Sequence, residues 1–254
     1  MKKLCILLAF LLFAVSLNAQ IYIKLGGGYG TSLTSQMLYS TNTSTSATYT
    51  YGSYGQGLNF GGTFGYMLNN NIGIELSGNY LLGKKYDNPN AFSGEDYTAS
   101  QRLYGNALSI TPALVLATAL DKQWMLYTKI GAVLAFPQVF VENTYTATTP
   151  NGPSGLDKFK ESGGMALGFA GAVGVDVMLS KGIGIFFEIN GIGLNYSPDT
   201  RENTETYTQT GHTISHVITY SETINSTDLY VLPSVRRQFS SIGASLGVSI
   251  LLGK

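Results

Sequence analysis

The stretch 163–195 constrains the fold more than any other part of the chain, because its side chains alternate between two kinds. Most of the alternate positions hold a large apolar residue, and the positions between them hold mostly small residues. Successive side chains of a β-strand point to opposite faces, so the pattern predicts strands at 165–179 and 183–190, joined by Ser180-Lys181-Gly182. One face carries only Asp176 and Glu188 as charges. This hairpin is typical of a strand pair between lipid and a narrow polar lumen.

The same alternation recurs along the chain and predicts eight strands. The other six are expected at Gln20–Thr31, 58–66, 72–80, Arg102–Ala119, 124–136 and 242–252. The connections alternate between long and short, and the four long ones are polar: 32–55, 83–101, 137–162 and 196–239. This layout predicts an all-β fold, an eight-stranded antiparallel up-and-down transmembrane β-barrel over 20–254, with short periplasmic turns and four long extracellular loops.

One predicted strand is less regular than the others. Pro112 lies inside it and has no N–H to give to a sheet ladder. A short helix over Ala113–Leu120 is therefore an alternative for this part of the chain.

Residues 1–19 have the form of a secretory signal peptide. Lys2 and Lys3 precede an uncharged apolar run that ends at Ala19, before Gln20. An uncleaved membrane anchor is the alternative, but a spanning helix needs about 18 or more apolar residues and this run is shorter. The single cysteine, Cys5, falls inside the signal, so the mature chain has neither a disulfide nor a thiolate metal ligand.

Composition narrows the class of protein further. Charged residues make up 12% of the chain, against about 25% in ordinary soluble proteins. The chain holds 15 basic and 15 acidic residues, and two of the basic ones belong to the signal. No basic surface is available to attract nucleic acid. An exported, charge-poor chain without a long apolar helix fits a barrel, which pairs all its backbone groups internally.

The identity of the second face decides which side of the barrel meets water. A secreted lipocalin-like barrel would enclose the apolar side chains around a ligand. Its exterior would then carry mainly Gly, Ala, Ser, Thr and Asn, with too few charges for a water-facing surface. The opposite arrangement, with the apolar face in lipid, is therefore expected. Aromatic residues near both strand ends would form the interfacial girdles: Tyr66 and Trp124 by the short turns, and Tyr29, Tyr80 and Phe136 by the long loops.

Five charged residues are expected to lie in the lumen at similar heights: Lys24, Glu75, Lys129, Asp176 and Glu188. An unpaired buried charge is costly, so these groups are expected to pair. A structural plug that closes the lumen is the favoured interpretation, and a gate or proton path is the alternative. Eight strands enclose an interior that side chains nearly fill, which argues against an open pore.

The runs LNFGGTFGYMLNNNIGIELSGNY and GFAGAVGVDVMLSKGIGIFFEING resemble those of small outer-membrane β-barrels. The family is that of the OmpA-type and OmpX-type transmembrane domains, and the porin-family proteins common in Bacteroidetes are especially similar. The resemblance covers the mature chain and implies a Gram-negative outer-membrane location, contact with lipid and lipopolysaccharide, and insertion by the barrel-assembly machinery. Two features depart from the pattern. No peptidoglycan-binding domain follows the barrel, and the chain ends Leu251-Leu252-Gly253-Lys254 instead of in an aromatic residue.

No catalytic or cofactor site is expected. His212 and His216 are the only histidines, and four positions along a strand separate side chains by roughly 13 Å, too far for one metal ion. Arg236 and Arg237 are candidate lipopolysaccharide contacts. The expected function is a non-enzymatic structural or surface-interaction role with an extracellular partner on the loops. Transport of small or hydrophobic solutes is the alternative, and a lipid-modifying hydrolase is a distant third.

Overall fold

The computed structural model describes residues 20–42, 46–121, 123–150, 152, 154–207, 212–222 and 230–252. The expected signal peptide at 1–19 and the last two residues of the chain lie outside this range. The described ranges contain sixteen strands. They are β1 Gln20–Ser32, β2 Gln36–Asn42, β3 Ala47–Gly52, β4 Gly57–Met67, β5 Ile72–Gly83, β6 Tyr86–Ser93, β7 Tyr97–Ala119, β8 Trp124–Ala147, β9 Gly155–Ser162, β10 Ala166–Met178, β11 Ile183–Tyr196, β12 Thr200–Tyr207, β13 His212–Ser221, β14 Val231–Pro233, β15 Arg237–Gln238 and β16 Ser241–Leu252. In the described part of the chain, no helix has the length and apolar character needed to cross a bilayer.

Eight of these strands form a closed antiparallel ring, as the alternating pattern predicted. The order around the ring is β1, β4, β5, β7, β8, β10, β11 and β16, which is also their order in the sequence. The ring closes between the first and last strands, with Ile21 opposite Leu252 and Ser32 opposite Ser241. Closure leaves no free strand edge within the ring.

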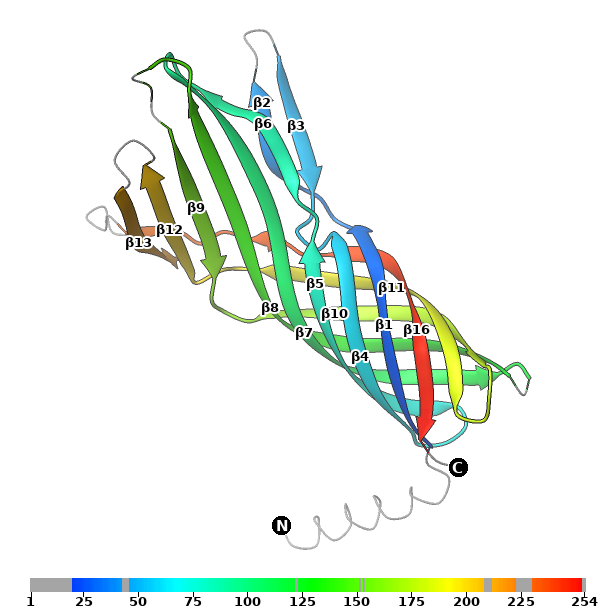
Figure 1. Cartoon of the computed structure of the whole chain (residues 1–254). Coiled ribbons are helices and arrows are strands. Elements are labelled where there is room, and N and C mark those ends of the chain that lie inside the picture. Colours follow the sequence, from blue (N-terminus) through cyan, green and yellow to red (C-terminus); the bar gives the residue numbers. More distant parts are fainter. Residues whose placement is uncertain are drawn as a thin grey trace, which may run out of the picture.

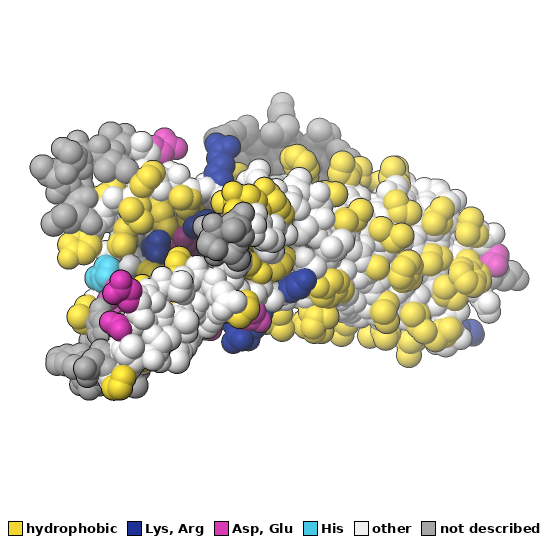
Figure 2. Space-filling model, turned by 90° about the horizontal axis from the view of Figure 1, so that it is seen from above, with side chains coloured by type: hydrophobic (Ala, Val, Ile, Leu, Met, Phe, Trp, Pro, Cys, Tyr) yellow, Lys and Arg dark blue, Asp and Glu magenta, His cyan; other side chains and the backbone are white. Residues whose placement is uncertain are grey.

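The side chains of the ring sort as alternation requires. Outward positions are large, apolar and exposed, for example Phe64, Ile130 and Phe169. Inward positions are mostly small, and the rest carry buried polar groups or buried large side chains such as Tyr22 and Tyr127. Figure 2 shows apolar side chains distributed over the ring, with charged side chains gathered toward its two ends.

Three tight connections form one end of the ring, here called the turn end. Asn69 Oδ1 accepts hydrogen bonds from the N–H groups of Asn71 and Ile72, both at 2.8 Å. Asp121 Oδ1 does the same for Gln123 at 2.7 Å and Trp124 at 2.8 Å. These side chains satisfy the backbone donors that a tight turn leaves unpaired.

The four long connections contain strands, so their prediction as loops was wrong in large part. β7 and β8 run far beyond the ring and carry an outer sheet in the order β6, β7, β8, β9, β12, β13 and β14. A separate hairpin, β2–β3, lies beside β6, where Tyr39 Oη donates to the Asp87 carbonyl at 3.1 Å. Figure 1 shows both groups extending from the same end of the ring. In β9 and β12 most side chains on both faces are polar, so the apolar alternation that marks a half-buried strand is missing there.

β7 continues as a strand through Ala119, which excludes the alternative helix at Ala113–Leu120. Pro112 lies opposite Leu76 of β5. On the other side, the ladder with β8 skips Thr111 and Pro112 and resumes at Ala113 opposite Gly131. The missing N–H therefore falls on the β8 side of the strand.

Candidate functional site

The structure brings all five predicted lumen charges together across the ring. The Lys129 ammonium lies 2.7 Å from Glu188 Oε2 and 3.3 Å from Glu75 Oε2. The Lys24 ammonium lies 3.6 Å from Glu75 Oε1 and 3.9 Å from Asp176 Oδ2. Each residue comes from a different strand, so the cluster connects β1, β5, β8, β10 and β11. We call these residues the ion cluster.

Neutral side chains complete the surroundings of the carboxylates. Tyr22 Oη donates to Glu75 at 2.7 Å, and Tyr127 Oη donates to Glu188 at 3.2 Å. Ser249 Oγ donates to Asp176 at 2.6 Å. The Tyr127 ring also lies 3.7 Å from the Lys24 ammonium, close enough for a cation–π contact. Each carboxylate thus meets both a positive charge and a hydroxyl donor, which offsets the cost of removing it from water.

Glycines make room for the two tyrosine rings. A Cβ on Gly65 would lie 2.1 Å from the Tyr22 ring, and one on Gly174 would lie 2.5 Å from the Tyr127 ring. The small inner residues predicted from the sequence therefore let large side chains cross the lumen at this level. Together with the ion cluster, the rings close the lumen toward the turn end.

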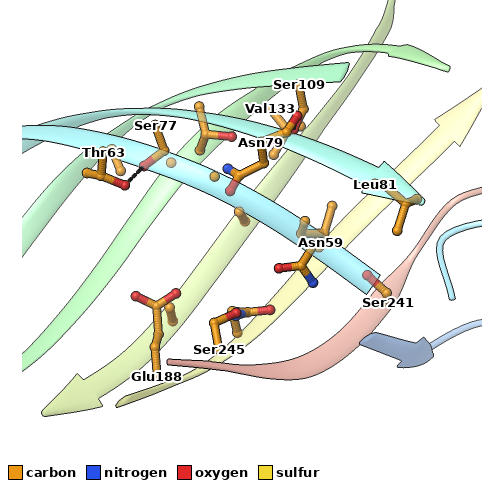
Figure 3. Close-up of a pocket in the computed structure, with 18 of the residues that line it drawn as sticks. Asn59, Thr63, Ser77, Asn79, Leu81, Ser109, Val133, Glu188, Ser241 and Ser245 are labelled. Carbon is orange, nitrogen blue, oxygen red and sulfur yellow. Dashed lines mark hydrogen bonds between the residues drawn. The ribbon is translucent and has the colours of Figure 1, made fainter. Parts of the chain in front are cut away.

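Above the ion cluster the lumen is not filled. A chamber of about 140 Å³ lies between the cluster and the far end of the ring, so side chains do not occupy the whole interior. Its belt of amides and hydroxyls comes from ring strands, and Figure 3 shows the labelled members of this belt, among them Asn59, Asn79 and Ser245, around one common space. The belt consists of Asn59, Thr63, Ser77, Asn79, Ser109, Thr111, Asn190, Ser241 and Ser245.

An aromatic roof covers the chamber at the end away from the turns. Phe239 lies with its ring centroid 5.8 Å from that of Tyr54 and 5.9 Å from that of Tyr196. All three side chains are buried. The roof is fastened by backbone hydrogen bonds, from Tyr54 N to the Gln238 carbonyl at 2.9 Å and from Phe239 N to the Leu194 carbonyl at 3.0 Å. Two segments that were predicted to be parts of long loops therefore fold inward over the lumen.

A buried ion pair anchors the roof at its outer side. Arg237 donates to both oxygens of Glu161, from Nε at 2.7 Å and from Nη2 at 2.5 Å. Tyr220 Oη donates to the same carboxylate at 2.8 Å. Burial raises the pKa of Tyr220 to about 12, and the negative charge of Glu161 acts in the same direction. The hydrogen bonds to Glu161 and its charge raise the pKa of Arg237 against the opposing effect of burial.

This anchor was missed in the sequence, because residues 76 positions apart meet through strands that were not predicted. The anchor also bears on the predicted lipopolysaccharide contact of Arg236 and Arg237. Nε and Nη2 of Arg237 donate to Glu161, and the contact of Arg236 and Arg237 with lipopolysaccharide stays a prediction.

The predicted interfacial aromatics point outward from the ring. Tyr29, Tyr80 and Phe136 are exposed on the side of the long connections, and Trp124 is exposed beside the turn that Asp121 organises. Tyr66 lies opposite Ile21, at the turn end. Their role as membrane-interface girdles remains a prediction.

The histidine region shows no metal-binding arrangement. His216 Nε2 lies 3.1 Å from the Asn203 amide nitrogen, and the side chain of His212 lies outside the described part of the structure. Within the ranges that the structure describes, no group of three or more His, Cys, Asp or Glu side chains has a geometry that could hold a metal ion.

Comparisons with known proteins agree with this architecture. The family model described as outer membrane protein beta-barrel domain matches residues 5–221. No curated protein matches the sequence. Among solved structures, a major outer membrane protein from Thermus thermophilus is 9% identical with a TM-score of 0.50, over 92% of this chain and 99% of that one.

Two further structures are similar at lower scores. CarO2 from Acinetobacter baumannii is 14% identical with a TM-score of 0.37, over 91% of this chain and 99% of that one. The outer membrane protease OmpT from Escherichia coli is 9% identical with a TM-score of 0.32, over 92% and 97%. At these identities the likeness concerns the fold alone. The family match, which spans most of the ring, shows that the chain belongs to the outer-membrane protein β-barrel family and is located in the outer membrane.

Proposed function

We propose that the protein is a closed barrel that anchors a β-sheet outside the cell for contact with an extracellular partner. The observation that carries the proposal is the uninterrupted pairing of β7 with β8 beyond the ring, from Asn106 opposite Gln138 to Tyr97 opposite Ala147. β8 has 24 residues, whereas a tilted transmembrane strand needs about 9–11. More than half of the strand is thus available to hold the outer sheet away from the lipid.

The orientation follows from the same geometry. The outer sheet and the β2–β3 hairpin would face the outside of the cell. The tight turns, together with the start of β1 and the end of β16, would face the periplasm. Short periplasmic turns and long external segments are the usual arrangement of outer-membrane barrels.

The lumen supports a closed barrel better than an open pore. The ion cluster blocks one end of the chamber and the aromatic roof covers the other. Transport of a solute would require both to move, so the surface-interaction role is preferred to steady transport. A non-enzymatic role is preferred, because the carboxylates of the ion cluster are paired with Lys24 and Lys129 inside the lumen.

Single-cysteine labelling tests the orientation. The mature chain has no cysteine, so each variant carries one reactive thiol. Val217→Cys in β13 should react with a membrane-impermeant maleimide on intact cells, because this side chain is exposed in the outer sheet. Lys181→Cys in a tight turn is the matched control and should react only after lysis. Labelling of Lys181→Cys on intact cells would reverse the proposed orientation.

Photo-crosslinking tests the partner. A photoreactive residue at Ile214, which is exposed on β13, should give a protein adduct of defined mass on intact cells in the presence of their natural extracellular surroundings. The same residue at Leu246, exposed on the ring, should crosslink only to lipid. Lipid adducts alone at both positions would contradict a partner on the outer sheet.

A further inference from the structure

The chamber above the ion cluster has walls of two kinds. Amides and hydroxyls form the belt around its sides, and aromatic rings lie at its two ends. The Phe186 ring is at the lower end, 5.6 Å from the Lys24 ammonium, and the Phe239 ring belongs to the roof. A solute in this space would meet flat apolar surfaces above and below and hydrogen-bonding groups around its edge.

Within the part of the chain that the structure describes, some belt groups hydrogen-bond to one another and others do not. Thr63 and Ser77 hydrogen-bond to each other, and Asn190 donates to Ser245. Asn59 and Asn79 also line the chamber, and among the described residues no side-chain hydrogen bond joins either amide to another residue; only the backbone carbonyl of Asn79 accepts one, from Ser109 Oγ at 3.5 Å. These amides can both donate and accept, which suits a hydroxyl group on a ligand.

The charges that face the chamber are already paired. Lys24, Lys129 and Glu188 line its lower end, and each belongs to the ion cluster. A charged solute would find no unpaired counter-charge and would lose its hydration on entry. The chamber is therefore suited to a neutral solute.

The volume sets the size of that solute. One water molecule needs roughly 10–15 Å³ of cavity volume, so the chamber of 140 Å³ accommodates on the order of ten waters. A solute of about ten to fifteen non-hydrogen atoms would displace them. A hexose in its ring form has this size, carries hydroxyls around its edge, and has C–H faces that pack on aromatic rings.

We infer that the chamber is a binding site for a neutral polyhydroxylated solute of monosaccharide size, occluded between the ion cluster and the aromatic roof. The solute enters from the roof side, because the roof is held by backbone hydrogen bonds from Tyr54 to Gln238 and from Phe239 to Leu194 and by one ion pair, Arg237–Glu161. The other end is closed by ion pairs between ring strands. This site is independent of the outer sheet and of any partner bound there.

Titration of the purified, full-length mature protein with D-glucose tests the inference, in a detergent without a sugar headgroup. Glucose should bind saturably and shift the side-chain amide NMR signals of Asn59 and Asn79. D-gluconate and D-glucosamine, which are charged, should bind at least tenfold more weakly. Absence of saturable glucose binding, or tighter binding of either charged probe, would overturn the inference.

Two variants locate the site. Asn79→Leu replaces the amide with an apolar group of the same branching and should weaken glucose binding at least tenfold. Thr111→Val removes one belt hydroxyl isosterically and should weaken it several-fold, even if Asn79→Leu fails to fold. Thr118→Val makes the same change on the outer face of β7 and should leave affinity unchanged. Equal affinities of Thr111→Val and Thr118→Val would place the binding elsewhere and refute the chamber.

Discussion

The Lys129 ammonium lies 2.7 Å from the Glu188 carboxylate across the lumen, although the two residues belong to strands that do not pair with each other. The same ammonium reaches Glu75 on a third strand. The Lys129 side chain thus links three strands at one level of the ring and also helps to close the lumen. The stability of the ring and the closure of its lumen therefore depend on the same contacts.

Removing the Lys129 charge should destabilise the barrel strongly. Lys129→Met leaves two buried carboxylates short of a positive charge, and loss of one partner of a buried pair typically costs about 3–5 kcal/mol. Urea unfolding in lipid vesicles measures this change. Lys181→Met, in an exposed turn, is the control and should change stability by less than about 0.5 kcal/mol. The double variant Lys129→Met/Glu188→Met should recover part of the loss, and no recovery would contradict the pairing.

The Tyr22 hydroxyl should contribute through its bond to Glu75. Tyr22→Phe removes a buried donor and should destabilise the barrel by about 1–3 kcal/mol. Tyr66→Phe changes a tyrosine on the outward face and should have a much smaller effect. The midpoint of heat-modifiable gel mobility measures the stability of both variants. Equal losses of stability would show that the Tyr22–Glu75 hydrogen bond does not stabilise the barrel.

Glycine positions give a steric test of the lumen. Gly65→Ala brings a methyl group against the Tyr22 ring and should cost about 1–3 kcal/mol in unfolding free energy. Gly78→Ala, on a neighbouring strand, has no atom within 4 Å of the added Cβ. That variant should be neutral or slightly stabilising. A larger loss for Gly78→Ala than for Gly65→Ala would mean that the inner and outer faces are misassigned.

The outer sheet should gain local stability on acidification through Asp157. Burial raises the pKa of this carboxyl, and the neighbouring Glu205 raises it further. The folded sheet thus holds the proton more tightly than the unfolded chain does. Its contribution to stability is greatest below the ordinary pKa of aspartate, about 3.9, and falls as pH rises through the raised value.

Amide hydrogen exchange of β9 and β12, corrected for intrinsic rates, measures this dependence. Protection should decrease as pH rises from about 4. Asp157→Asn removes the titrating group and should increase protection at pH 7 while reducing the pH dependence. Unchanged protection in Asp157→Asn would contradict a destabilising charge at this position.

The ring was predictable because each of its strands has a different environment on each face. Lipid on one side and a narrow lumen on the other impose the alternation that marks, for example, Phe64 and Gly65 as neighbours on opposite faces. The five lumen charges were identifiable for the same reason, since each interrupts a run of small residues. Tyr22 and Tyr127 lie on the same strand faces as Lys24 and Lys129, but alternation gives only the face and not which side chains meet across the lumen.

The outer sheet and the roof were not predictable from alternation. β9 and β12 are polar on both faces, and their pairing satisfies backbone groups without burying an apolar side. The roof depends on Phe239 and Tyr54, which meet only after two distant connections fold over the ring. Contacts of this kind leave no periodic signal in a single sequence.

The closed lumen is tested most directly by recording current through the purified protein in planar lipid bilayers. No steady conductance is expected for the unmodified protein, because the ion cluster closes the lumen at one level and the aromatic roof closes it at another. Lys129→Glu, which reverses one charge of the cluster, should lower stability without opening a stable pore while the roof remains in place. A steady, large conductance in the unmodified protein would contradict a lumen closed by the ion cluster and the aromatic roof.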